Sequence, residues 1–322
     1  MYNIVNEAIG EPMSDYTFSS ISIVKINPHR FRNILLLFLA LVLLISAVSS
    51  ISAAEGIKVI HDPSSPEVYP FSRNTLASFS SVSFFSSDES VLLKGWFFRS
   101  ENSKKLMLFV HDYSQNRTIF GENTDIVIND CLKKGYNVLL FDLRNSGNVS
   151  SSKATAGLNE AYDVEGALMY ASALDMREIY IIGFGTGANA VLNAEKPDTV
   201  KGMVLDSPFF KLSSALKFIY VQRNVKTFFF TKTFSVLFLR LFDKASRRVY
   251  NREYLRDIPP VLISRSGFSY LGTNEEKRLH DSISSDPDNV SIMAAFSSGP
   301  DVKDYLELVF NFFDEYTIKG VE

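Results

Sequence analysis

The fold of this chain is decided by the stretch Tyr180-Ile-Ile-Gly-Phe-Gly-Thr-Gly-Ala-Asn-Ala-Val-Leu192. Its first half is a short apolar run, which is typical of a buried strand. Its second half is rich in alanine and predicts a helix. Three glycines, Gly183, Gly185 and Gly187, join the two halves. Glycine permits a sharp turn and a close approach of two backbones, so we predict a strand that turns abruptly into a helix.

The glycines have the spacing of a nucleophile elbow, in which the sequence G-x-S-x-G lifts a serine hydroxyl above the end of a strand. Gly183 and Gly187 stand at the outer positions, but Gly185 stands where the serine should be. The motif therefore predicts an elbow without its nucleophile. The next residue, Thr186, also carries a hydroxyl. We expect it to open the helix, where threonine caps free N–H groups, rather than to act as a displaced nucleophile.

Apolar runs on both sides of this stretch predict the rest of the sheet. Continuous apolar runs indicate strands buried on both faces, as in a parallel sheet covered by helices. Segments 161–173 and 302–313 have apolar residues at helical spacing. We predict an α/β fold with a mainly parallel sheet of about eight strands. An antiparallel hairpin, 82–85 and 91–98, precedes the runs 106–110, 137–141, 179–182, 202–205, 261–263 and 290–294.

The N-terminal part contains a candidate membrane span. Residues 33–54 include no charged residue, and a helix of about 20 apolar residues crosses the hydrocarbon layer of a bilayer. A retained anchor is favoured over a cleaved signal peptide, because residues 1–32 form a long leader. Lys25, Arg30 and Arg32 precede the span. The positive-inside rule therefore leaves the N-terminus in the cytoplasm and the C-terminal part outside.

We divide the chain into a cytoplasmic tail (1–32), a transmembrane helix (33–54), a linker with several prolines and serines (55–78) and a globular domain (79–322). A helical lid is expected at about 209–256, where basic residues and phenylalanines interleave. Such a segment can favour an anionic membrane surface, but we prefer a lid whose aromatic side chains pack over the sheet. The chain is thus predicted to be a single-pass protein of the cell membrane with an extracytoplasmic domain.

Composition argues against several classes of protein. The single cysteine, Cys131, rules out an intrachain disulfide framework and is expected to be a buried thiol. A net charge of -3 implies no polyanionic partner, and no motif of a nucleic-acid-binding module is present in the sequence. We predict no cofactor and no metal site.

Several motifs follow one another in an order that resembles the α/β-hydrolase family. The matching pieces are Gly95-Trp96, the loop His111 to Arg117, Gly135 to Val138, Phe141 to Gly147, Gly157 with Glu160 and Asp163, the elbow, and Leu205 to Pro208. The resemblance covers residues 80–316 and is strongest to membrane-anchored bacterial members, in which a hairpin ending in a Gly-Trp strand precedes the parallel sheet. It implies the α/β-hydrolase fold.

The resemblance also implies an oxyanion hole. One of its N–H groups would come from the loop His111-Asp112-Tyr113, and the other from Thr186, which follows the centre of the elbow. The family has a glycine where this chain has Asp112. A carboxylate beside the hole would repel the negative charge that the hole should stabilise. His111 is implied to be a structural residue rather than a base.

The catalytic acid and histidine are missing from the positions that the resemblance implies. The loop after 261–263 has no carboxylate before Glu275, and the loop 297–301 has no histidine. His280 precedes the last strand in a helical segment, and we interpret it as a surface residue. Asp206 follows another strand and would be the catalytic acid only in an alternative geometry of the active site. In that role it has no histidine to orient.

Asp142 and Arg144 are interpreted as an ion pair that braces a loop rather than as a general base and its partner. The prediction is a membrane-anchored α/β-hydrolase-like protein without catalytic residues, which binds a small apolar ligand or a protein partner. The alternative is a serine-type esterase or lipase-like hydrolase that acts on an unknown ester or amide. A serine-directed phosphonate probe distinguishes the two, because it needs an activated hydroxyl.

Overall fold

The structure is a computed structural model that describes residues 28–61, 67–68, 79–147, 149, 155–209, 255, 257–267, 275–296 and 300–316. The chain divides into two units, residues 1–47 and 48–322. Most of the predicted tail, linker and lid lie outside the described residues. Those three parts of the predicted domain organisation stay predictions.

The first helix, α1, extends from Pro28 to His61. Within it, Pro28–Ile51 is long and apolar enough to cross a membrane, with a mean hydropathy of 2.9. A signal sequence near the N-terminus satisfies the same criteria of length and composition. The helix extends beyond the predicted span 33–54 at both ends. Residues 55–61, predicted as linker, are helical, since no proline interrupts them before Pro63.

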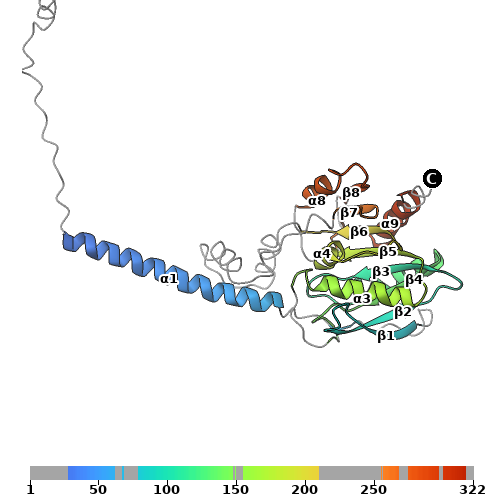
Figure 1. Ribbon diagram of the computed structural model, residues 1–322, viewed down its shortest axis with the longest axis horizontal. Helices are drawn as coiled ribbons and strands as arrows, with labels where there is room; N and C mark the ends of the chain where they lie inside the picture. The colour runs from blue at the N-terminus through green and yellow to red at the C-terminus, as the bar shows by residue number, and fades with distance from the viewer. Residues whose placement is uncertain are drawn as a thin grey trace, which may run out of the picture. The chain divides into compact units, whose positions relative to one another are not determined.

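Eight strands form one sheet. They are β1 (Phe79–Phe85), β2 (Leu92–Phe98), β3 (Lys105–Val110), β4 (Tyr136–Phe141), β5 (Glu178–Phe184), β6 (Val200–Asp206), β7 (Val261–Arg265) and β8 (Ser291–Ala295). Their order in the sheet is β1-β2-β4-β3-β5-β6-β7-β8, which Figure 1 shows from bottom to top. β2 is antiparallel to β1 and to β4, and the other neighbouring pairs are parallel. The predicted hairpin and mainly parallel eight-stranded sheet are confirmed.

The central strands are buried on both faces, as their continuous apolar runs predict. Leu108 of β3, Leu139 of β4 and Ile181 of β5 are fully buried, and the residues next to them in each strand are at most 4% exposed. A strand of this kind shows no alternation of apolar and polar residues, because helices cover both of its faces. The functional residues therefore have to lie at the strand ends and in the loops.

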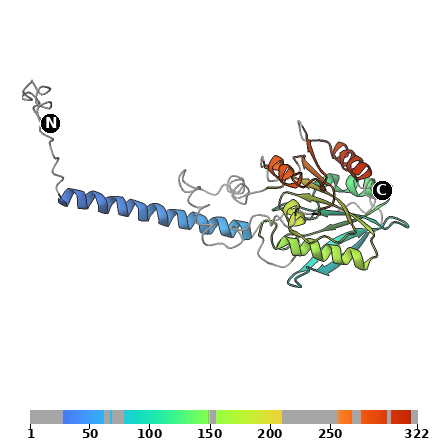
Figure 2. The ribbon, with the colours of Figure 1, turned by 45° about the horizontal axis from the view of Figure 1, so that its top comes forward.

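Helices cover the two faces of the sheet. The helices are α2 (Thr124–Lys133), α3 (Glu160–Ala173), α4 (Thr186–Asn193), α8 (Glu276–Ile283) and α9 (Val302–Tyr316), with a short 3-10 helix, η1 (Gly121–Asn123), before α2. Side chains of α3, α4 and α8 enter one apolar cluster, and side chains of α2 and α9 enter another. Figure 2 shows α8 (orange) and α9 (red) together at one end of the sheet, with α3 (green) at the other end.

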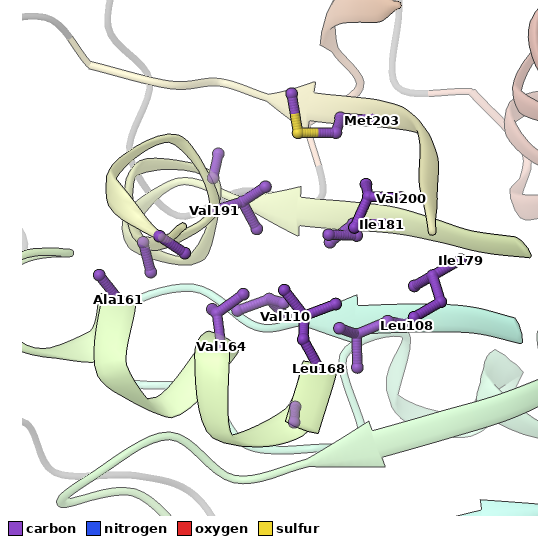
Figure 3. Packing of buried hydrophobic residues seen from close by; sticks show 14 of the residues in the cluster. Leu108, Val110, Ala161, Val164, Leu168, Ile179, Ile181, Val191, Val200 and Met203 are labelled. Atoms are coloured by element: carbon purple, nitrogen blue, oxygen red, sulfur yellow. The ribbon is translucent and has the colours of Figure 1, made fainter. Parts of the chain in front are cut away.

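Side chains of α3 pack against β3 in the apolar cluster that α3, α4 and α8 share. Figure 3 shows Val164 and Leu168 of α3 next to Leu108 and Val110 of β3. Val164 is fully buried and Leu168 almost fully. Burial of such a side chain stabilises the fold by about 1.5–3 kcal/mol. This packing fixes the end of β3, and with it the loop that follows Val110.

Candidate functional site

The elbow has the predicted strand–turn–helix geometry. β5 ends at Phe184, α4 begins at Thr186, and Gly185 lies between them with φ 47° and ψ -107°. A positive φ is costly for residues other than glycine. At Gly187 a Cβ would collide with the backbone carbonyls of Val110 and His111. The glycines therefore bring the first turn of α4 against the end of β3.

The side chain of Asp112 lies inside the predicted oxyanion hole. Asp112 follows β3 in the loop and is fully buried. Its Oδ1 accepts a hydrogen bond of 2.7 Å from the backbone N–H of Thr186 and one of 2.6 Å from the backbone N–H of Tyr113. Thr186 follows the centre of the elbow, and Tyr113 belongs to the loop after β3. These are the two sources of N–H groups that an oxyanion hole requires.

This arrangement corrects the expected role of Asp112. The sequence led us to expect a carboxylate beside the hole that would repel an oxyanion. The structure places the carboxylate inside the hole, where it is an intramolecular hydrogen-bond acceptor. Hydrogen bonds from N–H groups to an ionised carboxylate are stronger than those to neutral acceptors, so the two backbone donors are saturated by the protein itself.

Asp112 and Gly185 are sterically complementary. A Cβ built on Gly185 would lie closer than 3.0 Å to Oδ1, Oδ2 and Cγ of Asp112, a distance that Cβ atoms essentially never show. The carboxylate therefore takes the space that the side chain of a serine at position 185 would need. A serine at 185 and the observed position of Asp112 exclude each other.

Both ring nitrogens of His111 are engaged. Nε2 accepts a hydrogen bond of 3.0 Å from the backbone N–H of Leu143, so Nδ1 carries the proton and donates to the carbonyl oxygen of Asp112 at 2.8 Å. Burial lowers the pKa of His111, with Asp142 opposing the shift. A neutral imidazole with no unused nitrogen links the loops after β3 and β4, and it has no lone pair left for a base.

Thr186 does not cap α4. Its hydroxyl is buried, and no group among the described residues hydrogen bonds to Oγ1. The N-cap position is Gly185, and α4 has no side-chain cap. Thr186 therefore opens α4 as expected, but the expected capping role is wrong, because Thr186 is the first residue of the helix and Gly185 is the N-cap. Among the described residues, no base is hydrogen bonded to this hydroxyl.

Asp206, at the end of β6, lies next to the elbow. Its backbone carbonyl accepts the N–H of Gly185 at 2.8 Å. Its carboxylate accepts hydrogen bonds from Ser264 Oγ (2.7 Å), the backbone N–H of Ser266 (3.0 Å) and Ser207 Oγ (3.1 Å). Burial raises the pKa of Asp206, and these hydrogen bonds oppose the shift. Sequence reasoning named Asp206 but missed Ser264, which directly follows the apolar run 261–263, and Ser266, the first residue after β7.

Asp142 and Arg144 brace loops, but not as a pair. Asp142 binds Arg117, whose Nη2 lies 2.5 Å from Oδ2, and Arg144 binds Asp163, with Nη2 2.7 Å from Oδ1. Arg117 also lies over the ring of Trp96, 4.9 Å from its centroid. The predicted contact between Asp142 and Arg144 is wrong, because each side chain finds its counter-ion on another loop or helix.

His280 lies far from the elbow along the strand direction. It is half-buried on α8, and its Nδ1 lies 3.0 Å from Ser291 Oγ, at the first residue of β8. The elbow is at the opposite, C-terminal, ends of the parallel strands. Residues 268–274 and 297–299, from the loops expected to carry an acid and a histidine, lie outside the described residues. Within the described residues, no cluster of three or more metal-binding side chains is found.

Comparison with solved structures identifies the fold. Esterase Pf2001 of Pyrococcus furiosus superposes with a TM-score of 0.60 at 21% identity, over 79% of this chain and 99% of that one. Esterase RhEst1 of Rhodococcus gives 0.54 at 16% identity, over 74% and 99%. An acylaminoacyl peptidase of Pyrococcus horikoshii gives 0.54 at 16% identity, over 80% of this chain and 47% of that one. No protein-family model and no curated protein matches the chain. The chain has the α/β-hydrolase fold.

Proposed function

We propose that this protein is a noncatalytic α/β-hydrolase-fold protein, which acts by binding a small apolar ligand or a protein partner. One observation supports this most strongly. Asp112 Oδ1 accepts both backbone N–H groups that would otherwise stabilise an oxyanion. A substrate carbonyl would have to displace a buried, charge-assisted acceptor before it could be polarised.

The typical costs of losing oxyanion-hole donors and a catalytic nucleophile favour loss of turnover. Removing one donor from an oxyanion hole costs about 10²–10³ in kcat, and here both donors are taken. Loss of the nucleophile or base of a triad costs about 10⁶, and position 185 has no hydroxyl. The two effects act on the same step, so the elbow provides neither attack on a carbonyl nor stabilisation of the product of attack.

The fold comparison by itself favours the second class, a serine-type hydrolase. The similar structures are named esterases and a peptidase. Any hydrolase activity in this chain would need a nucleophile other than residue 185. Ser207 is one candidate besides Thr186, since it is buried with φ 50° and its hydroxyl donates to Asp206 Oδ1 at 3.1 Å.

The deciding experiment combines a phosphonate probe with hydrolysis of p-nitrophenyl butyrate by the purified full-length protein. We expect no labelling and no rate above background. A rate that disappears in Ser207→Ala or Thr186→Ala would replace the binding role by a hydrolase with that nucleophile. A rate that survives both substitutions would place the catalytic centre elsewhere and would also refute the noncatalytic proposal.

We further propose that α1 anchors the protein in the cell membrane as a single span, with the N-terminus in the cytoplasm and the domain outside. The support is the apolar window Pro28–Ile51 and the basic residues Lys25, Arg30 and Arg32 at its start. Recovery of a mature chain beginning near Glu55 would indicate a cleaved signal peptide instead.

A further inference from the structure

A pocket lies away from the elbow, between α3 and the segment that follows α4. Its volume is about 440 Å³, which is within the range of small-molecule sites. Leu168 and Met169 of α3 form an apolar wall, and Met169 is 63% exposed. Two groups of opposite charge, the amine of Lys196 and the carboxylate of Glu165, also line the pocket.

The amine of Lys196 has an unusual set of partners. Its Nζ donates to the backbone carbonyls of Leu192 (3.2 Å) and Ala194 (2.6 Å), and no carboxylate of the described residues lies within ion-pair distance. A neutral amine has two N–H groups and one lone pair. The two carbonyls take both N–H groups, which leaves the lone pair unused by any hydrogen bond among the described residues.

The carboxylate nearest to this amine is already engaged. Glu165 Oε2 accepts the hydroxyl of Ser87, and Oε1 accepts the backbone N–H of Glu195 at 3.0 Å. Burial lowers the pKa of Lys196 to about 8, with Glu165 opposing the shift. At pH 7.5 roughly a quarter of such amines are neutral, against about one in a thousand for an ordinary lysine.

We propose that Lys196 is a nucleophilic amine that forms an imine with a small neutral aldehyde bound in this pocket. The alkyl chain lies against Leu168 and Met169. Glu165 and Glu195 disfavour an anionic carbonyl compound by repulsion. The nitrogen attacks the carbonyl carbon, and one N–H proton moves to the oxygen to give a carbinolamine. The C–O bond then breaks, the oxygen leaves as water with the second N–H proton, and the C=N bond forms.

The test uses the full-length protein in detergent with butyraldehyde and cyanoborohydride, which reduces the imine to a stable secondary amine. Peptide mass spectrometry at low conversion compares Lys196 with Lys201. Lys201 is a matched internal control, since its Nζ also donates to a backbone carbonyl, that of Asp198 at 2.8 Å, but it is exposed and lines no part of this pocket. At pH 7.5 we expect Lys196 to react at least about tenfold faster. Equal rates would overturn the proposal.

Two further comparisons test the pocket itself. Met169→Ser removes the exposed part of the apolar wall. It should slow the reaction of Lys196 with butyraldehyde severalfold and leave its reaction with formaldehyde unchanged, because formaldehyde needs no wall. Glyoxylate should show a smaller ratio of Lys196 to Lys201 modification than butyraldehyde does. An unchanged butyraldehyde rate in Met169→Ser, or an equal ratio for glyoxylate, would refute binding of a neutral aldehyde in this pocket.

Discussion

Replacement of Gly185 by serine should destabilise the protein strongly, because the new side chain and the Asp112 carboxylate need the same space. If the carboxylate is displaced, two hydrogen bonds to a charged group are lost, at about 1.5–3 kcal/mol each. The positive φ of 47° adds about 1–2 kcal/mol for a residue with a Cβ. The expected loss is therefore about 4–8 kcal/mol, a large part of the 5–15 kcal/mol that typically stabilises a domain.

A double-mutant cycle with Asp112→Ala measures how much of this loss of stability comes from the contact between residues 112 and 185. Asp112→Ala alone loses the same two hydrogen bonds. In the double variant those bonds are lost only once, so its cost should be smaller than the sum of the single costs by about 3 kcal/mol or more. The loop after β3 then has space for the serine, and only the cost of the positive φ is added.

The assay is thermal unfolding of the full-length protein in detergent, followed by the fluorescence of Trp96, the single tryptophan. At about 2–4 °C per kcal/mol, Gly185→Ser should lower Tm by roughly 10 °C or more. Gly121→Ser is the matched control, because Gly121 has a φ of 56° and nothing within 4 Å of its Cβ position; its Tm should fall by only a few degrees. Additive costs in the cycle, within about 0.5 kcal/mol, would refute the contact between Asp112 and position 185.

Three more predictions concern activity, pH and topology. Gly185→Ser, alone or with Asp112→Ala, should not hydrolyse p-nitrophenyl butyrate, since Nε2 of His111 accepts the N–H of Leu143 and activates no hydroxyl; a rate well above wild type would contradict this. Burial lowers the pKa of His111 below the unfolded value, so the unfolded state binds the extra proton and stability should fall as pH drops below about 6.5. His111→Gln should flatten this dependence in Tm measurements between pH 7 and 5, and an unchanged slope would show that another group titrates. Protease added outside intact spheroplasts should digest the domain, whereas protection until permeabilisation would reverse the proposed orientation.

The sheet could be predicted because its signals are local. The runs that form β3, β4 and β5 are almost wholly apolar. Such runs are typical of strands that helices cover on both faces, which show no alternation of apolar and polar residues. The elbow could be predicted because Gly185 and Gly187 mark a positive φ and a close backbone approach. Both signals lie within a few neighbouring residues of the chain.

The contents of the site could not be predicted, because they depend on contacts between distant loops. Asp112 and Thr186 are separated by 74 positions. The sequence is the same whether the carboxylate of residue 112 lies beside the hole or inside it. Likewise, Asp142 and Arg144 are close in sequence, yet each binds a partner on another element. Sequence spacing indicates which residues to consider, but the direction of each side chain is set by the loop conformation.

The two departures from the serine-hydrolase motif, at positions 112 and 185, are best understood as one structural feature. With Gly185 and no carboxylate, the N–H groups of Thr186 and Tyr113 would be buried without an acceptor, at about 1–3 kcal/mol each. With a carboxylate and a serine at 185, the two side chains would overlap. Each change is therefore stable only in the presence of the other. A single substitution at either position leads to a less stable protein rather than to a partial enzyme, so the site resists stepwise conversion into a serine-hydrolase elbow.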